Sequence, residues 1–208
     1  MTQHTNTVSE ETVERVKAFH GHTCPGSAIG IRAAAIALER IGPHATDEEV
    51  VAVVETDMCA VDAIQVMTGC TFGKGNLIHR DYGKNAFTFF RRSDGKAIRI
   101  VTKPLAWGDP SSERRDLLAK LLSGTASEQE RQRFRQIQAE RTQAILSMPV
   151  DALFDIQPVN TPPPPKARLH ESLVCEGCGE EVMETRVRRF GGRNLCIPCY
   201  DRASQGRG

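Results

Sequence analysis

The chain has 208 residues, 27 Lys and Arg against 26 Asp and Glu, a formal net charge of +1 and a hydrophobic fraction of 39%. This length supports one substantial core and a small appended unit. No run approaches the roughly 18 apolar residues needed to cross a bilayer, and the balanced charge gives no general affinity for nucleic acid. Seven cysteines, without a secretory signal after Met1, predict a cytoplasmic protein whose thiols act as ligands or nucleophiles.

The first half of the chain predicts two helices followed by a mixture of strands and a short helix. Ser9 can cap a helix to about Phe19, and Pro25 suits the first position of a second helix that ends before Gly42. The second helix is apolar on nearly every side, which predicts a central, buried position. The elements expected next are a strand at 50–54, a helix at 61–67 closed by Gly69, and strands at 77–79, 86–91 and 97–102.

Two more helices are predicted beyond these strands. The first runs from Asp109 to about Gly124, and Ser127 with Glu130 forms a capping box for a long polar helix to about Met148. The few apolar anchors of the long helix place it on the surface or against a partner. Because strands and helices follow one another without a regular βαβ rhythm, the predicted fold class is α+β, with a mixed or antiparallel sheet and packed helices.

A run of one threonine and four prolines at Thr161–Pro165 predicts a semi-rigid spacer. It divides the chain into a core domain at 1–160, a linker at 161–170 and a tail at 171–208. The tail carries two CxxC pairs separated by 17 residues, a spacing that predicts one structural zinc ion in a zinc ribbon or treble-clef finger. A redox dithiol is the alternative. The predicted ligands are Cys175, Cys178, Cys196 and Cys199.

The finger resembles the DksA/TraR type, which implies protein contact rather than base reading. From Cys175 onward the sequence has six Arg or Lys against five Asp or Glu. Zinc with four thiolates adds −2, so the folded tail carries about −1, which argues against nucleic acid as a partner. The sequence therefore predicts a finger that binds a protein partner or supports the structure. Transcriptional regulation through the finger is a weaker alternative.

The core domain has two clusters in which thiols, imidazoles and carboxylates gather at predicted element ends. In the first, His20, His22 and Cys24 share one side of an extended segment, and Cys24 takes the cap of the buried helix, where the helix dipole lowers a thiol pKa. In the second, Cys59 follows the valine-rich strand, which predicts that it faces a crevice, and Asp62 is close behind. These residue types suit a metal site or an activated nucleophile.

A third cluster at 68–76 is a glycine-punctuated loop with Lys74 at its tip. Its spacing differs from a Walker motif, because only three residues separate Gly69 from Gly73 and no hydroxyl residue follows the lysine. The loop could still present backbone N–H groups and Lys74 to an anion. Cys70, within this loop, suits a ligand and a buried apolar position equally well.

The motifs of the core domain resemble the FmdE component of formylmethanofuran dehydrogenase and its stand-alone relatives. The resemblance covers about the first 150 residues. It implies an α+β core that forms a homodimer and carries a cysteine and histidine metal site, for zinc or another late first-row transition metal. It does not imply a defined reaction. The motifs are HGHTCPG at 20–26, ETDMCAVDAIQ at 55–65, TGCTFGKGNL at 68–77 and DYGKNAFTFF at 81–90.

Residue roles carried over from this resemblance complete the prediction. The expected catalytic residues are Cys59, His22, Cys24 and Asp62, and the expected core metal ligands are His20, His22, Cys24 and Cys59. Asp57 or Asp62 would orient an imidazole or move a proton, and Lys74 and Asn76 would contact an anionic or carbonyl-bearing small molecule. We therefore expect a metal-binding accessory or stand-alone protein related to oxidoreductases. The alternative is a non-catalytic, metal-responsive adaptor that acts through the finger.

Overall fold

The structure is a computed structural model that describes residues 8–104 and 112–205. The chain forms two compact units, divided between Lys166 and Ala167. In the part of the chain that is described, no helix combines the length and the apolar character needed to cross a membrane.

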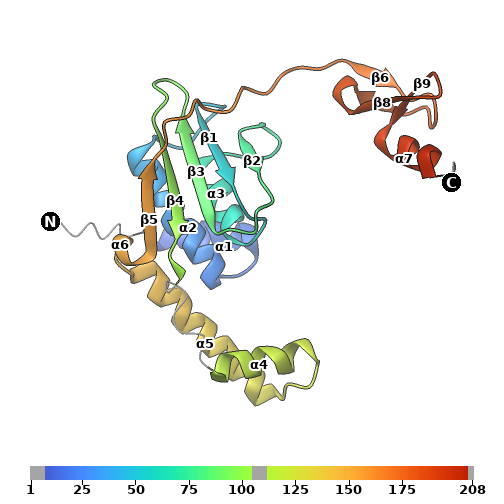
Figure 1. The fold of residues 1–208 in the computed structure, drawn as a ribbon. Helices are drawn as coiled ribbons and strands as arrows, with labels where there is room; N and C mark the ends of the chain where they lie inside the picture. Colours follow the sequence, from blue (N-terminus) through green and yellow to red (C-terminus); the bar gives the residue numbers. More distant parts are fainter. Residues whose placement is uncertain (1–7, 105–111, 206–208) are drawn as a thin grey trace. The chain divides into compact units, whose positions relative to one another are not determined.

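The first unit is built on a five-stranded mixed sheet with the order β2-β1-β3-β4-β5 (Figure 1). The first strand pairs in parallel with the second, and the other neighbours are antiparallel. The predicted α+β fold with a mixed sheet is confirmed, and the first four strands match their predicted ranges. The strands are β1 (Val50–Val54), β2 (Leu77–His79), β3 (Ala86–Arg91), β4 (Ala97–Thr102) and β5 (Phe154–Pro158).

Three helices, α1 (Glu10–His20), α2 (Pro25–Arg40) and α3 (Ala60–Thr68), lie on one face of this sheet (Figure 1). The second of them is buried along most of its length, as its apolar sequence predicts. It packs closely on α3, because a Cβ atom placed on Gly30 would lie 2.2 Å from the carbonyl oxygen of Ala60. Only a glycine allows the two helix starts to approach this closely.

The polar helix α5 (Glu128–Ser147) begins with the predicted capping box between Ser127 and Glu130. It forms a hairpin with α4 (Ser112–Leu122), and its C-terminal part packs against α2 (Figure 1). The predicted start of α4 at Asp109 lies outside the described residues. A short helix, α6 (Val150–Leu153), then leads into β5. Neither α6 nor β5 was predicted from the sequence.

A buried arginine ties α5 to α2. The Arg32 side chain is 2% exposed, and its Nη1 donates to the carbonyl oxygens of Ile145 and Leu146 at 3.3 and 2.6 Å. Both carbonyls belong to the last turn of α5, where no amide follows to satisfy them within the helix. The guanidinium therefore serves as a cap for the C-terminal end of α5.

The opposite face of the sheet carries a smaller apolar cluster formed by Val51, Val53, Phe90 and Ala97, with Val159 packed against it. Beyond Val159, the chain continues along the first unit. Arg92 Nη1 donates to the carbonyl oxygen of Pro164 at 2.5 Å, and its Nη2 donates to that of Pro165 at 3.2 Å. The proline run thus has contacts with the first unit over part of its length.

The second unit is small and consists of two hairpins and one helix. In the β8–β9 hairpin, Gly191 and Gly192 both have positive φ, 58° and 82°, which matches the right-handed twist of the flanking strands. This hairpin leads directly into the second cysteine pair. The elements are β6 (Ser172–Val174), β7 (Glu181–Met183), the 3₁₀ turn η2 (Glu184–Arg186), β8 (Val187–Phe190), β9 (Arg193–Cys196) and α7 (Ile197–Gln205).

Candidate metal centres

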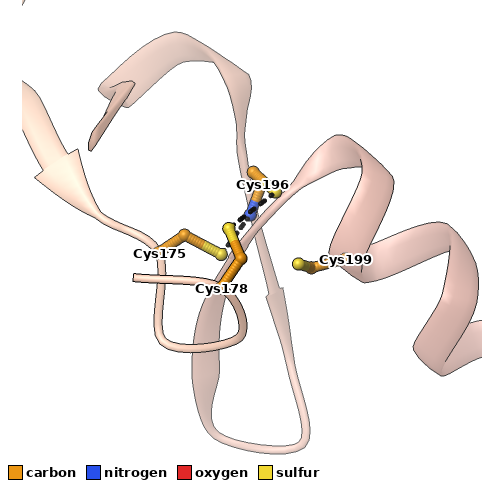
Figure 2. A group of neighbouring side chains, drawn as sticks. All are labelled: Cys175, Cys178, Cys196 and Cys199. Atoms are coloured by element: carbon orange, nitrogen blue, oxygen red, sulfur yellow. Dashed lines mark hydrogen bonds between the residues drawn. The ribbon is translucent and has the colours of Figure 1, made fainter. Parts of the chain in front are cut away.

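The four thiols of the second unit converge on one point (Figure 2). Cys175 and Cys178 lie on a tight turn after β6, Cys196 ends β9, and Cys199 lies in the first turn of α7. Their sulfur atoms all lie within 4.8 Å of one another. Gly179, with φ of 77°, donates its N–H to the carbonyl oxygen of Cys175 at 2.8 Å and closes the turn. A turn, a hairpin and a helix holding four thiols match a treble clef better than a ribbon.

The electrostatics of this four-cysteine cluster favour a bound cation. The backbone N–H of Cys196 donates to Cys175 Sγ at 3.2 Å and lowers the pKa of Cys175 to about 6. The N–H of Glu180 favours the Cys178 thiolate, but burial and the neighbouring thiols outweigh it and raise the pKa of Cys178 to about 12. Four thiolates this close repel one another unless a positive ion lies between them. The donor set and its spacing fit zinc, and four protein ligands make a closed, structural site.

The core cluster consists of His20, His22 and Cys24, with Cys59 beside them. It is positioned by the start of a buried helix. Cys24 caps α2, and its Sγ accepts from the N–H of Ser27 at 3.4 Å, while Ser27 Oγ accepts from the N–H of Cys24 at 3.0 Å. Burial opposes ionisation of Cys24, but the donors from Ser27, Cys59 and Gly26 lower its pKa below the ordinary value. Pro25 takes the first helical position, as predicted. The helix start therefore holds a thiol in an environment that favours the thiolate.

A hydrogen bond to a carboxylate orients the first imidazole of the core cluster. His20 Nδ1 lies 2.6 Å from Asp62 Oδ2, and His20 Nε2 lies 4.0 Å from Cys24 Sγ. An ionised carboxylate only accepts hydrogen bonds, so Nδ1 carries the proton and the lone pair of Nε2 is on the side of the thiol. The hydrogen bond with Asp62 also raises the pKa of His20, against the effect of burial. A carboxylate that fixes the tautomer in this way is typical of metal-binding histidines.

The second imidazole completes a group of three donors. The His22 ring lies 4.6 Å from the His20 ring, centroid to centroid, and the donor atoms of His20, His22 and Cys24 all lie within 4.8 Å of one another. His22 is exposed and the other two are half-buried. These residues fit a borderline-soft ion such as zinc, which prefers nitrogen and sulfur ligands. Three of the four predicted core ligands therefore lie together, and Cys59 is outside this group of three.

Cys59 lies beside this group of three, and it lines a cavity together with two of them. A Cβ atom placed on Gly26 would lie 3.7 Å from the sulfur atoms of both Cys24 and Cys59, which brings the two thiols to one place. Burial, followed by the neighbouring Cys24 thiol, raises the pKa of Cys59. The cavity has a volume of about 540 Å³, within the range of small-molecule sites, and His22, Cys24 and Cys59 contribute to its lining. The starts of α2 and α3 thus meet at one pocket.

The glycine-rich loop takes a different place. Asn76 is fully buried, its amide donates to the carbonyl oxygens of Asp47 and Val50, and its Oδ1 accepts from the N–H of Thr71. Lys74 donates to the carbonyl oxygen of Ala45 at 3.0 Å. Neither side chain lines the 540 Å³ cavity. These contacts organise the loop, and the ligand-binding role expected for the two residues stays a prediction.

The remaining sequence candidates are also separate from the cavity. Cys70 is fully buried, donates to the carbonyl oxygen of Val50 at 3.4 Å, and has its pKa raised by burial. Asp57 is exposed. Of the two carboxylates expected to orient an imidazole, Asp62 is therefore the one in contact with a histidine.

Sequence reasoning missed a second set of cavity residues. Arg114 of α4 and Gln138 and Arg141 of α5 line the same cavity as the thiols. The last two are three positions apart and share one face of α5, next to the buried Ile137 and Thr142. In the sequence, the nearby apolar residue Ile137 indicates that this face of the helix packs against the protein. It does not indicate which part of the chain the helix covers.

Comparison with known proteins supplies the family. A sequence profile described as "FmdE, Molybdenum formylmethanofuran dehydrogenase operon" matches residues 19–155, which include every residue of the core cluster. The chain belongs to the FmdE family. A second profile, the prokaryotic DksA/TraR C4-type zinc finger, matches residues 171–205. Both resemblances noted in the sequence are confirmed, and the family with its cysteine clusters supports metal binding by this chain.

Two relatives of this FmdE protein are informative. A probable S-adenosyl-L-methionine-binding protein from Archaeoglobus fulgidus is 36% identical over 192 residues, which cover 89% of this chain and 51% of that protein. The chain therefore spans about half the length of that curated relative. The crystal structure of a tungsten formylmethanofuran dehydrogenase FmdE-like protein from Syntrophus aciditrophicus has a TM-score of 0.62 and 25% identity, and the match covers 92% of this chain and 91% of that one.

Proposed function

We propose that this FmdE-family chain is an accessory or stand-alone protein related to oxidoreductases, whose core binds a transition-metal ion next to a small-molecule pocket. One observation carries the proposal. The donor atoms of His20, His22 and Cys24 lie within 4.8 Å of one another, and two of these residues line a cavity of about 540 Å³.

In this proposal, His20, His22 and Cys24 hold the ion, and Cys59 is a fourth ligand or a free thiol beside it. A bound divalent ion supplies Lewis acidity to a ligand in the cavity. Asp62 keeps His20 in the tautomer that leaves Nε2 available, and the Ser27 cap stabilises the Cys24 thiolate. The fold thus prepares both ligand types before the ion binds.

Metal analysis of the full chain tests this assignment. The wild-type protein is expected to hold two equivalents, one of them the zinc of the finger. His22→Ala and Cys24→Ser should each lose about one equivalent, whereas Cys70→Ser, a matched change of a buried thiol outside the cluster, should lose none. Retention of both equivalents in His22→Ala and Cys24→Ser would contradict the proposal.

The non-catalytic adaptor is the alternative, and it assigns the finger a partner and the core metal a sensory role. The finger supports it through exposed apolar side chains, of which Leu173, Val174 and Met183 lie on the β6–β7 hairpin. We also propose a homodimer in the cytoplasm, on the strength of the family resemblance and the reduced thiols. Analytical ultracentrifugation with and without metal separates the two functions, because a metal sensor changes its assembly with metal and a metal-dependent enzyme need not.

The Archaeoglobus relative supplies a candidate ligand, S-adenosyl-L-methionine. The cavity is large enough for a ligand of that class. Because this chain spans half of that relative, the name applies here only if the ligand site lies in the shared half. Equilibrium dialysis with labelled S-adenosyl-L-methionine tests it: saturable binding that Cys59→Ala or Arg141→Gln weakens supports this ligand, and no saturable binding removes it.

A further inference from the structure

The cavity beside the core cluster has a second, positively charged set of residues. Arg114 comes from α4, and Gln138 and Arg141 come from α5. Among the described residues that line the cavity, none is Asp or Glu. The described lining therefore has two guanidinium groups and no carboxylate, and the proposed metal ion would add further positive charge.

The two arginines lie close enough to influence each other. Burial lowers the pKa of Arg141, and the positive charge of Arg114 lowers it further. A guanidinium has five N–H donors in a rigid fork that matches the two oxygens of a carboxylate or phosphate. Like charges held together in a half-buried pocket repel each other, and an anion bound between them relieves this repulsion, which makes such a pair a candidate binding site.

The fold also fixes where Arg141 lies. Arg32 holds the last turn of α5 through the carbonyl oxygens of Ile145 and Leu146. Arg141 is one helical turn before Ile145, so the same contact that ties α5 to α2 positions Arg141 near the start of α2, where Cys24 lies. The buried Arg32 guanidinium thus holds α5 against α2, so Arg141 lies on an anchored helix rather than on a loop.

We infer that the cavity receives a small molecule bearing an oxyanion group, a carboxylate or a phosphate, which pairs with Arg114 and Arg141 while the rest of the molecule faces Cys24 and Cys59. This inference deepens the proposed function. The part of it that places the rest of the molecule near a metal ion rests on that proposal. Gln138 also lines the cavity, where its amide supplies a neutral donor and acceptor that give the pocket directional specificity.

A pair of alkylating reagents tests the inference without knowledge of the natural ligand. Iodoacetate and iodoacetamide both react with a thiolate, which displaces iodide and forms a carbon–sulfur bond, but only iodoacetate carries a carboxylate. The rate of each at Cys24 is measured by peptide mass spectrometry on the full chain, as purified and after dialysis against a chelator. The ratio of the two rates cancels the thiolate fraction and reports anion preference.

We expect the iodoacetate to iodoacetamide ratio at Cys24 to exceed that of N-acetylcysteine. It should fall about threefold to tenfold in Arg114→Gln and in Arg141→Gln, the size expected for one lost charge in a partly solvated pocket. Arg135→Gln is the matched control, because Arg135 lies on α5, is exposed, and pairs with Glu128 outside the cavity. An unchanged iodoacetamide rate in each variant shows that the site is still folded.

Two probes then distinguish the source of the oxyanion. Acetate and inorganic phosphate are each added in competition, and the one that protects Cys24 from iodoacetamide in the wild type, but not in Arg141→Gln, identifies the preferred group. A ratio that does not respond to either arginine, or an absence of protection by both anions, would overturn the inference. Metal analysis is independent of these rates, so an arginine-dependent ratio without core metal would remove the metal proposal and leave the anion site.

Discussion

The two cysteine clusters of this chain are held in place by different means. In the finger, the only described core consists of Leu195 and three of the cysteines themselves, with a few partly buried neighbours such as Phe190 and Tyr200. In the first unit, Cys24 and Cys59 lie at the starts of helices that are buried against a five-stranded sheet. Cysteine therefore has a structural role in the finger, where there is little apolar core. In the first unit the fold already holds Cys24 and Cys59 in place, so their thiols are available for ligands.

The largest expected effect comes from removing metal. A chelator, or Cys196→Ser, should unfold the finger, because the apparent binding free energy of a structural zinc is about 10–16 kcal/mol and the unit has little else to stabilise it. Hydrogen exchange is the measurement: amides of β8 and β9 should lose protection, and amides of α2 and β1 should keep it. Cys24→Ala should leave both regions protected. Finger amides that stay protected without metal would contradict the claim that the finger depends on its metal ion for folding.

The next effect concerns the packing that positions the core thiols. Gly30→Ala places a Cβ atom 2.2 Å from the carbonyl oxygen of Ala60, so α2 and α3 must move apart. We expect a loss of about 3 kcal/mol in the free energy of unfolding of the first unit, measured by denaturant titration. Gly73→Ala is the matched control, because a Cβ atom there meets nothing within 4 Å. Equal stability of the two variants would contradict this account of the packing.

A smaller effect is expected from the anchor of α5. Arg32→Ala removes the donor to two carbonyl oxygens in the last turn of that helix and leaves a void. The expected cost is about 2 kcal/mol, since unsatisfied buried carbonyls cost more than the relief of burying a charge returns. Thermal unfolding of the variant measures it, and exchange of the α5 amides should rise before that of β1. A variant as stable as the wild type would show that Arg32 has no such role.

The smallest effect is electrostatic and concerns His20. Because the hydrogen bond to Asp62 raises the pKa of His20, protonated His20 stabilises the metal-free fold below the pKa of the unfolded chain, about 6.5, and this contribution disappears as the pH rises through the folded pKa. Asp62→Asn should lower the pKa of His20, as measured by NMR titration of the ring in the metal-free protein. Asp57→Asn, a change of an exposed carboxylate, should leave it in place. An unaltered pKa in Asp62→Asn would contradict the assigned tautomer.

Local signals in the sequence predicted much of the fold. The cap at Cys24 followed by Pro25, the valine run of β1 and the capping box at Ser127 each depend on neighbouring residues, and each lies where it was expected. The strand β5 was missed because it ends at a proline and owes its conformation to pairing with β4. Pairing between distant segments leaves little trace in a single sequence.

The candidate site was likewise predicted where its residues are close in sequence and missed where they are distant. His20, His22 and Cys24 are at most four positions apart, so their convergence follows from local geometry at a helix start. The arginines of the cavity are about 90 residues or more further along the chain, and only the packing of α5 on α2 brings them to the thiols. Asn76, which the sequence associated with a ligand, is instead bonded to backbone groups of three neighbouring residues.

The central claim is that the core holds a second metal ion with ligands unlike those of the finger. X-ray absorption on the full chain carrying Cys175→Ser and Cys196→Ser, in which the finger cannot close its site, tests it most directly. The account predicts that a metal remains and has a mixed shell, with nitrogen at about 2.0–2.1 Å and sulfur at about 2.3 Å for zinc. A variant that retains no metal, or one with sulfur ligands alone, would contradict it.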